Sequence, residues 1–306
     1  MIIMKVVCSN DESLHRIEAS RWRNRMSLME PLGEVVIVLP CSMRKPYSNS
    51  KSHHIFMKTT RGFQEAILTT PFGVCPRELE KTYPIQSYDV ATTGDWSYEE
   101  KKIAGQVLKE YVKDKTVIAH VSGGYLETCE EYLDDFIFTA PNGRPISADS
   151  MYTLRTELKK YQKNPRKEKR LHELRSIAKY QFGENGDKLI PDNVISKGNY
   201  HKKIYYNHEQ LALLNMDRGL YSLNLAGGDL LAKEGVHCVE IDFDLETNTV
   251  FAPGVNSADM DIIPRDEVVV TRDGECVGVG RAILSGEEMV KSSKGIAVRV
   301  RHRVKK

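Results

Sequence analysis

The chain has 306 residues, of which 44 are Lys or Arg and 42 are Asp or Glu, so its formal net charge is +2. A hydrophobic content of 41% excludes a wholly disordered chain, and no apolar run approaches the roughly 18 residues that span a bilayer. We therefore expect a cytoplasmic protein of about two or three domains, with no signal peptide and no membrane partner.

The cysteines are spread widely and form no CxxC pair, so we expect neither a disulfide framework nor a structural zinc site. His53 and His54 lack further ligands at suitable spacing, and the sequence predicts no metal and no cofactor. By default each cysteine is a small buried hydrophobic residue, unless its surroundings favour a reactive thiol.

The first half of the chain alternates between strand and helix patterns. This alternation predicts an α/β fold with a mostly parallel sheet, in which ligands lie beyond the carboxyl ends of the strands. The loops after Leu39, Thr69 and Val121 are of that kind. The predicted elements are helices at 14–29, 98–113 and 126–133 and strands at 34–40, 67–70, 115–121 and 135–139.

The pattern changes near residue 151. A charged helical stretch is predicted over 151–180, with a break at Asn164-Pro165, and the region after Gly228 is rich in strands, which indicates a small β-barrel. We expect domains at 1–154, 155–228 and 229–306. The predicted strands are 202–206, 219–225, 236–243, 250–252, 267–271, 275–284 and 296–304.

Two segments are strongly basic although the whole chain is nearly neutral. Residues 155–175 hold nine Lys or Arg against three Glu, and residues 291–306 hold seven Lys or Arg and no acid. Such localised charge indicates contact with a polyanion. The alternative is a solvated helix face and a charged tail.

The densest group of reactive side chains follows the first predicted strand, between residues 40 and 54. Cys41 stands just past that strand, and Arg44, Lys45 or His53 could lower the pKa of its thiol and favour the nucleophilic thiolate. The alternative is a buried structural cysteine in a polar loop.

A second group lies between residues 70 and 80, where Arg77 and Glu78 offer a charge pair. Asp89 and Asp95 then place carboxylates close to an aromatic side chain. Asp95 is equally well explained as the N-cap of the helix that begins near Tyr98.

The spacing Pro-Cys-x3-Lys-Pro-Tyr-x2-Ser-x2-His resembles the signature of the archaeosine synthase family, archaeal relatives of tRNA-guanine transglycosylase. Segments 70–80, 88–89 and 93–96 resemble that family's central domain, and segments 178–183 and 219–223 resemble its linker domain. Segments 250–255 and 279–282 resemble a PUA domain, a small RNA-binding barrel. The signature is filled by Pro40, Cys41, Lys45, Pro46, Tyr47, Ser50 and His53, seven fixed positions in fourteen.

The resemblance implies an amidine-forming transferase, which adds an amine to the nitrile of 7-cyano-7-deazaguanine in the D-arm of tRNA. It also implies a parallel-sheet fold like that of uracil-DNA glycosylase, which holds a flipped base. The amine donor is lysine, glutamine-derived ammonia or free ammonia. Cys41 would be the nucleophile, Lys45 or His53 would stabilise the thiolate and move protons, and Tyr47 and Ser50 would orient the base. The substrate-binding candidates are Thr70, Pro71, Gly73, Arg77, Glu78, Asp89 and Asp95.

In the last strand, valines alternate with arginines, so one face can pack into the barrel while the other faces phosphates. A solubilising edge strand is the alternative. The buried face is expected to hold Val298, Val300 and Val304. The candidate RNA-binding residues are Gly254, Arg281, Lys294, Arg299, Arg301 and Arg303.

The chain also departs from the family. Longer members begin with a transglycosylase-like barrel for which this chain has no room, and Arg265-Asp266 replaces the Gly-Asp of many PUA domains. One alternative is therefore a non-catalytic tRNA-binding subunit or paralogue, which works with a separate transglycosylase-like chain or as a homodimer. A base-excising glycosylase is a weaker alternative, because the loop after Leu39 lacks the expected water-activating segment.

Overall fold

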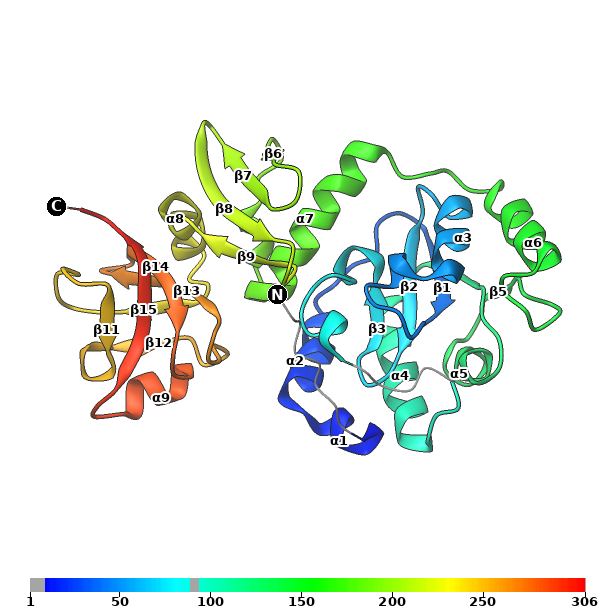
Figure 1. The fold of residues 1–306 in the computed structure, drawn as a ribbon, viewed down its shortest axis with the longest axis horizontal. Coiled ribbons are helices and arrows are strands. Elements are labelled where there is room, and N and C mark those ends of the chain that lie inside the picture. The colour runs from blue at the N-terminus through cyan, green and yellow to red at the C-terminus, as the bar shows by residue number, and fades with distance from the viewer. Residues whose placement is uncertain (1–8, 89–93, 306) are drawn as a thin grey trace. The chain divides into compact units, whose positions relative to one another are not determined.

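The computed structural model describes residues 9–88 and 94–305 of the chain. It divides into two compact units, Met1–Ser176 and Ile177–Lys306, each described here by itself (Figure 1). None of the helices in the described ranges has the length and apolar character that crossing a membrane requires.

The first unit is built on a five-stranded sheet with the order β3-β2-β1-β4-β5. β1, β2, β4 and β5 are parallel, which confirms the predicted sheet, and β3 pairs antiparallel with β2 as a hairpin. β3 was not predicted, because its glycine and proline are typical of loops and are tolerated at a sheet edge. The strands are β1 Val35–Pro40, β2 Gln64–Thr69, β3 Gly73–Pro76, β4 Thr116–Ala119 and β5 Ile137–Phe138.

Helices cover both faces of this sheet. Right-handed crossovers place α3, which joins β1 to β2, on the face opposite α5, which joins β4 to β5. The contacts agree, since α3 packs on α6 while α4 packs on α5 and β3. The predicted break at Asn164-Pro165 is confirmed. The helices are α1 Asn10–His15, α2 Ile17–Met26, α3 Lys51–Thr59, α4 Tyr98–Tyr111, α5 Gly124–Tyr132, α6 Ala148–Leu158 and α7 Arg166–Phe182.

Local sequence explains where these elements begin. The aliphatic run of β1 is buried on both faces of the sheet, as expected of a central strand. α4 begins at Ser97, whose side chain accepts a hydrogen bond from the backbone of Glu100 while the Glu100 carboxylate accepts one from the Ser97 backbone. The N-cap is therefore Ser97, and the alternative that placed Asp95 there is wrong.

The second unit begins with a four-stranded antiparallel sheet, in the order β6-β7-β8-β9, against which α8 packs. Asn207 and His208 both have positive φ, at 47° and 70°, and make the tight turn between β7 and β8. β8 was not predicted. The elements are β6 Ile195–Lys197, β7 Lys202–Tyr206, β8 Glu209–Asn215, β9 Leu220–Leu223 and α8 Leu225–Lys233.

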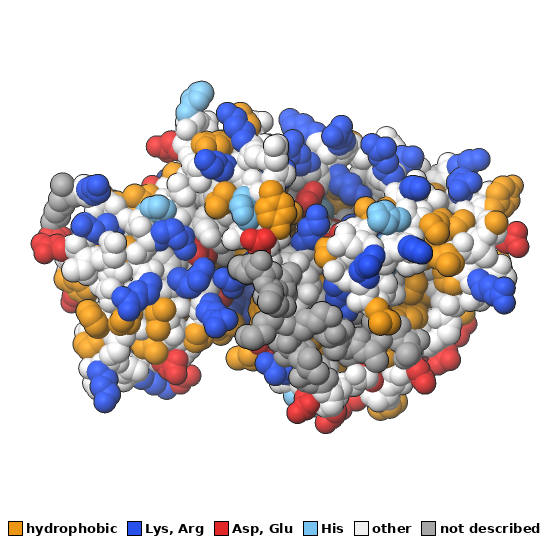
Figure 2. All heavy atoms as spheres, viewed as in Figure 1, with side chains coloured by type: hydrophobic (Ala, Val, Ile, Leu, Met, Phe, Trp, Pro, Cys, Tyr) orange, Lys and Arg blue, Asp and Glu red, His pale blue; other side chains and the backbone are white. Residues whose placement is uncertain are grey.

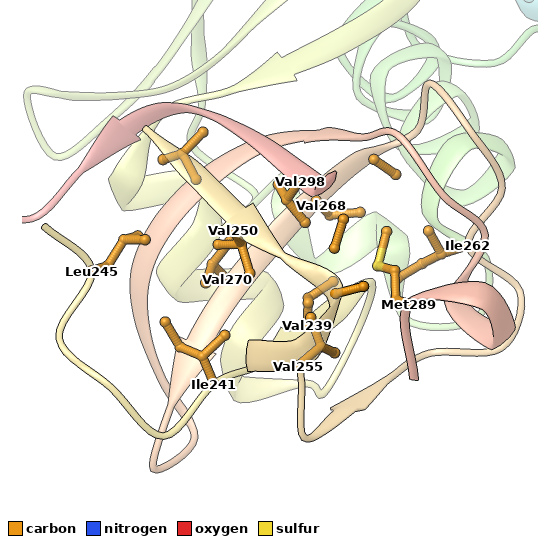
Figure 3. Close-up of a cluster of buried hydrophobic side chains, with 14 residues drawn as sticks. Val239, Ile241, Leu245, Val250, Val255, Ile262, Val268, Val270, Met289 and Val298 are labelled. Carbon is orange, nitrogen blue, oxygen red and sulfur yellow. The ribbon is translucent and has the colours of Figure 1, made fainter. Parts of the chain in front are cut away.

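A six-stranded sheet, in the order β11-β15-β14-β13-β10-β12, completes the second unit and confirms the predicted strand-rich region. Its inner face holds an aliphatic cluster built around Val239, Val268, Val270 and Val298, closed by Met289 of α9 (Figure 3). The elements are β10 Cys238–Glu240, β11 Thr249–Phe251, β12 Ser257–Ala258, β13 Glu267–Arg272, β14 Glu275–Ala282, α9 Gly286–Lys291 and β15 Ile296–Arg303.

Candidate functional site

Cys41 lies directly after Pro40, the last residue of β1, and is half-buried. Its Sγ lies 3.0 Å from the hydroxyl oxygen of Tyr125, which follows β4. Burial raises the pKa of the Cys41 thiol, whereas the hydrogen bond from Tyr125 and the positive charge of Lys45 partly oppose this rise. The resting thiol is therefore protonated, and Tyr125 and Lys45 can stabilise the thiolate when it forms.

Tyr125 is a site residue that the sequence did not single out. It is the second residue of α5 and follows the Gly123-Gly124 turn. Its ring packs edge-on against Trp96, with ring centroids 5.0 Å apart, and burial raises the pKa of its hydroxyl. A tyrosine just past a glycine turn, at the carboxyl end of a predicted strand, was the available signal.

Lys45 and Tyr47 shape the loop that follows Cys41. The Lys45 ammonium lies 5.8 Å from the centroid of the Tyr47 ring. Tyr47 is fully buried, its hydroxyl donates to Thr69 Oγ1 at 3.2 Å, and burial raises its pKa well above the ordinary value. Tyr47 therefore joins the loop after β1 to the end of β2.

His53 is buried, and both of its ring nitrogens have partners. Nε2 lies 3.1 Å from the Pro40 carbonyl oxygen, and Nδ1 lies 2.7 Å from a guanidinium nitrogen of Arg77. Burial and the Arg77 charge lower the pKa of His53 to about 3, so the ring is neutral, donates from Nε2 and accepts at Nδ1. Ser50 caps α3, accepting a hydrogen bond from the backbone of His53.

Arg77 is the centre of a buried ionic network. Its guanidinium pairs with Glu65 at 2.5 Å and with Glu80 at 2.8 Å, and Glu80 also accepts a hydrogen bond from the Ser48 backbone at 2.8 Å. Burial opposes the charge of Arg77, but the two carboxylates outweigh it and raise its pKa. The network thus contacts His53 through Arg77, and it contacts the loop after Cys41 through the hydrogen bond between Glu80 and the Ser48 backbone.

Glu78 has other partners, so the expected Arg77–Glu78 charge pair is wrong. Its carboxylate accepts from Gln64 at 2.9 Å and lies 3.0 Å from His172 Nε2. Burial alone would raise the pKa of Glu78, but the His172 and Gln64 hydrogen bonds outweigh it and lower the pKa. The two residues point to different partners because they occupy consecutive positions of a 3-10 turn, Arg77–Leu79.

The remaining candidates lie around the hairpin of β2 and β3. Thr70 donates to Glu100 at 3.1 Å, the peptide bond before Pro71 is cis, and Gly73 has φ +83°. Asp95 is exposed, and Asp89 lies outside the described residues.

One group in the described ranges could hold a metal ion. It consists of Asp11, His15 and Glu99, whose ligand atoms lie within 4.8 Å of one another. All three side chains are exposed. Cys41 is not part of this group.

In the second unit, the basic residues of β15 divide into two kinds. Arg299 is exposed, lies opposite Arg281 of β14 in register, and donates to Thr249 at 3.2 Å. Arg301 makes a bidentate pair with the buried carboxylate of Glu267, at 2.8 and 2.6 Å. Arg281 and Arg299 therefore form an outward pair, whereas the guanidinium of Arg301 is held by the protein.

The alternation in β15 does not continue to its end. Val298 and Val300 are buried as expected, but Val304 is half exposed, because a bulge near Gly280 shifts the register. Lys294 is exposed in the turn before β15, and Arg303 is half-buried. A Cβ on Gly254 would lie 2.6 Å from the Phe243 ring, which explains the glycine.

A pocket of about 620 Å³ opens beside the end of β15. It lies within the second unit, so it is not part of the Cys41 site. Three cations contribute to its wall together with the start of α8. Its lining includes Asn224, Leu225, Asn248, Arg301, Arg303 and Lys305.

Three models of domain families match this chain in succession. Residues 19–158 match a domain of unknown function, DUF5591. Residues 172–235 match the patch-forming domain C2 of tRNA-guanine transglycosylase, and residues 239–304 match the PUA domain. The chain therefore joins a parallel-sheet unit to a domain of the kind named for tRNA-guanine transglycosylase and to a PUA domain.

Individual relatives match nearly the whole chain. The archaeosine synthase of Methanocaldococcus jannaschii is 35% identical, over 93% of this chain and 52% of its own length. The archaeosine synthase subunit alpha of Methanosarcina acetivorans is 36% identical, over 97% of this chain and 51% of its own. The crystal structure of AF0587, a protein of unknown function, matches 93% of this chain and 100% of its own, with a TM-score of 0.73 and 28% identity.

Proposed function

The chain is homologous to the archaeosine synthases and spans about half the length of the curated relatives it matches, and on this premise we propose that it modifies tRNA in the archaeosine pathway. The proposed reaction adds an amine to the nitrile of 7-cyano-7-deazaguanine in the D-arm. The observation that carries the proposal is the Cys41 thiol, which lies at the carboxyl end of β1 within hydrogen-bond distance of Tyr125.

The chemistry needs neither an oxidant nor a reductant. The Cys41 sulfur adds to the nitrile carbon while a proton is delivered to the nitrile nitrogen, which gives a thioimidate. The amine nitrogen then bonds to the same carbon, the carbon–sulfur bond breaks, and an amine proton returns to the sulfur. The product is an amidine, and the thiol is regenerated.

The structure suggests a role for each neighbour of the thiol. Because burial keeps the Tyr125 hydroxyl protonated, it serves as a hydrogen-bond donor to the thiolate, and the Lys45 charge adds to this stabilisation. His53, Tyr47 and Ser50 act as positioning residues, since His53 holds the Pro40 carbonyl, Tyr47 binds the end of β2 and Ser50 caps α3.

A base in folded tRNA must leave its stack before Cys41 can reach it. The fold of uracil-DNA glycosylase holds such a flipped base, and a likeness to that fold is therefore part of this proposal. We propose that five residues bind the base or the amine, namely Thr70, Pro71, Gly73, Asp89 and Asp95. Arg77 and Glu78 would instead stabilise the loops that carry these residues. The amine donor remains one of lysine, glutamine-derived ammonia and free ammonia.

The second unit would dock the RNA. The PUA match and the outward pair of Arg281 and Arg299, with Lys294 nearby in sequence, support contact with phosphates. The proposed domains are a catalytic core at 1–154, a linker domain at 155–228 and the RNA-binding barrel at 229–306. A separate transglycosylase-like chain or a second copy of this chain is a further proposed partner, because several relatives are named as an alpha subunit.

The test is to incubate the protein with nitrile-bearing tRNA and each candidate amine, and to measure the mass of the modified nucleoside. We expect a mass gain equal to the added amine. The Cys41→Ala variant should lose turnover and still bind tRNA, and Tyr125→Phe should slow turnover by about 10- to 100-fold. Cys238→Ala, at another half-buried cysteine, should turn over normally.

Each other outcome contradicts a stated part of the proposal. Normal turnover by Cys41→Ala would show that the covalent step is wrong. Binding without any mass change, even when a relative's partner subunit is added, would instead support a non-catalytic tRNA-binding subunit. Release of a free base would support a glycosylase.

A further inference from the structure

Two basic segments of the first unit, far apart in the sequence, have few acidic residues. Residues 51–62 contain three Lys or Arg and no Asp or Glu, and residues 159–170 contain seven Lys or Arg and one Glu. The first segment is α3 and the turn that follows it, and the second joins α6 to the start of α7. Together they hold ten of the 44 Lys and Arg residues and one acidic residue, in a chain that is nearly neutral as a whole.

The fold brings these two segments into contact. The Asn164 backbone donates to the Gly62 carbonyl at 2.8 Å, and the Lys169 ammonium donates to the Phe63 carbonyl at 3.0 Å. A Cβ on Gly62 would lie 3.0 Å from the Cβ of Lys163, so the side chain of Lys163 starts beside the turn after α3. The charges therefore form one surface, and Lys and Arg side chains gather over this part of the unit (Figure 2).

We name this surface the α3 cationic surface. Along α3, the exposed residues Lys51, His54 and Lys58 recur at spacings of three and four, which places them on one outward stripe. Nine helical residues extend the stripe over about 14 Å. The surface is made by the exposed side chains of Lys51, Lys58, Arg61, Lys163, Arg166 and Lys167.

The stripe begins at the candidate active site. Ser50 is the N-cap of α3, which begins at Lys51. In the first turn of the helix, His53 binds the carbonyl of Pro40, the residue before Cys41. A polyanion bound along the stripe would therefore extend from the turn at Arg61 to the loop that contains the Cys41 thiol. This continuity distinguishes the α3 cationic surface from a helix face that is charged only for solubility.

We infer that the α3 cationic surface binds the phosphate backbone of RNA and directs the strand that carries the reacting base towards Cys41. This inference rests on the proposed function, and it adds an RNA contact on the catalytic unit to the one proposed for the PUA module. Interfaces between proteins are depleted in lysine, whereas phosphate contacts are made mainly by lysine and arginine, so RNA fits this surface better than an acidic protein does.

The experiment compares two triple variants in binding an unmodified tRNA transcript, measured by fluorescence anisotropy at several salt concentrations. The first variant is Lys58→Gln, Arg61→Gln and Lys163→Gln. The matched control is Lys102→Gln, Lys109→Gln and Lys113→Gln, at exposed lysines in and just after α4, on the other face of the sheet. Thermal unfolding of both variants checks that neither has lost its fold.

We expect the first variant to bind tRNA at least tenfold more weakly at about 0.1 M salt, with a log–log salt slope smaller by about 2 to 3, because each lost phosphate contact removes about 0.9. The control should keep the wild-type affinity and slope. Wild-type affinity and slope in the first variant would overturn the inference, as would loss of binding to a protein subunit with tRNA binding intact.

Failure of the inference and failure of the proposed function have different signatures. If the wild-type protein binds tRNA but never changes the nucleoside mass, the proposed chemistry is wrong, and the salt slopes still decide the RNA surface. If the mass changes in the wild type while both triple variants bind alike, the chemistry stands and the α3 cationic surface does not bind RNA.

Discussion

His53 shows how a buried imidazole can fix a backbone carbonyl without carrying charge. Its Nε2 holds the Pro40 carbonyl and its Nδ1 faces Arg77, which is itself held by Glu65 and Glu80. A proton on Nδ1 would place two cations side by side in a buried site. The neutral ring therefore positions the residue before Cys41 and is unsuited to proton transfer.

This arrangement makes stability depend on pH. The pKa of His53 is about 3 in the folded protein, below the ordinary 6.5, so the unfolded chain takes up the proton first as the pH falls. Its contribution is complete above pH 6.5 and declines below it by about 1.4 kcal/mol per pH unit. We predict that acidification from pH 7 to 5 costs the wild type about 2 kcal/mol more than it costs His53→Gln, measured by urea unfolding.

The neighbouring His54 provides the control. It is exposed on the same helix, so His54→Gln should lose as much stability as the wild type over the same pH interval. Equal acid sensitivity in His53→Gln and the wild type would show that the imidazole is not held neutral.

At this scale, the sequence draws attention to the Cys41 thiol more readily than to the residues that contact it. Cys41, Lys45 and His53 lie within one short motif after a recognisable strand. Tyr125 reaches Cys41 across 84 residues, and a single sequence contains no spacing that reveals such a contact. The partners of Arg77 were missed for a related reason, because a 3-10 turn sends consecutive side chains to different neighbours.

Among the elements, the hairpin of β2 and β3 is held tightly against α4. Gly73 begins β3 with φ +83°, and a Cβ there would lie 2.6 Å from the Cβ of Val107 on α4. Both the backbone conformation and the space therefore require glycine. The turn of the same hairpin holds Thr70 and Pro71, just after β2, so the packing of the hairpin determines where these candidate residues lie.

We predict that Gly73→Ala lowers the free energy of unfolding by about 2 to 4 kcal/mol, from backbone strain together with overpacking. Gly143 has φ +69° with no atom within 4 Å of an added Cβ, so Gly143→Ala should cost only the strain, about 1 to 2 kcal/mol. Urea unfolding of both variants measures the difference. If both variants lost the same free energy of unfolding, α4 would have to shift at Val107 to make room for the added methyl group.

The elements that the sequence predicted correctly are those with a clear hydrophobic pattern. The continuous aliphatic residues of β1 indicate a buried strand, and the amphipathic pattern of α4 indicates a helix. β3 and β8 were missed because β3 contains a glycine and a proline, and because β8 follows a two-residue turn without glycine at Asn207-His208. Tertiary pairing, rather than local propensity, makes these segments strands.

For the whole molecule, a net charge of +2 gives little general attraction to RNA, so binding depends on where the cations lie. The family matches confirm the resemblance inferred from the Cys41 motif and the PUA-like segments. What the sequence could not reveal is which arginines are free to meet phosphates, because Arg301 and Arg299 occupy equivalent places in its alternating pattern.

We predict opposite effects at these two arginines. Arg299→Gln should weaken tRNA binding and lower its salt slope by about 0.9, with thermal stability unchanged. Arg301→Gln leaves the buried Glu267 carboxylate without its positively charged partner, and should cost about 2 kcal/mol or more of stability. Salt titrations of tRNA binding and urea unfolding measure the two effects. A stable Arg301→Gln protein with a reduced slope would reverse the assignment.

The protonated resting state of Cys41 has a consequence for the lifetime of the protein. Oxidation by peroxide to sulfenic acid proceeds through the thiolate, so a thiol whose pKa is raised by burial reacts slowly with oxidants. In the proposed reaction, a Cys41 thiol that ionises only when the substrate binds would be protected from oxidants between turnovers.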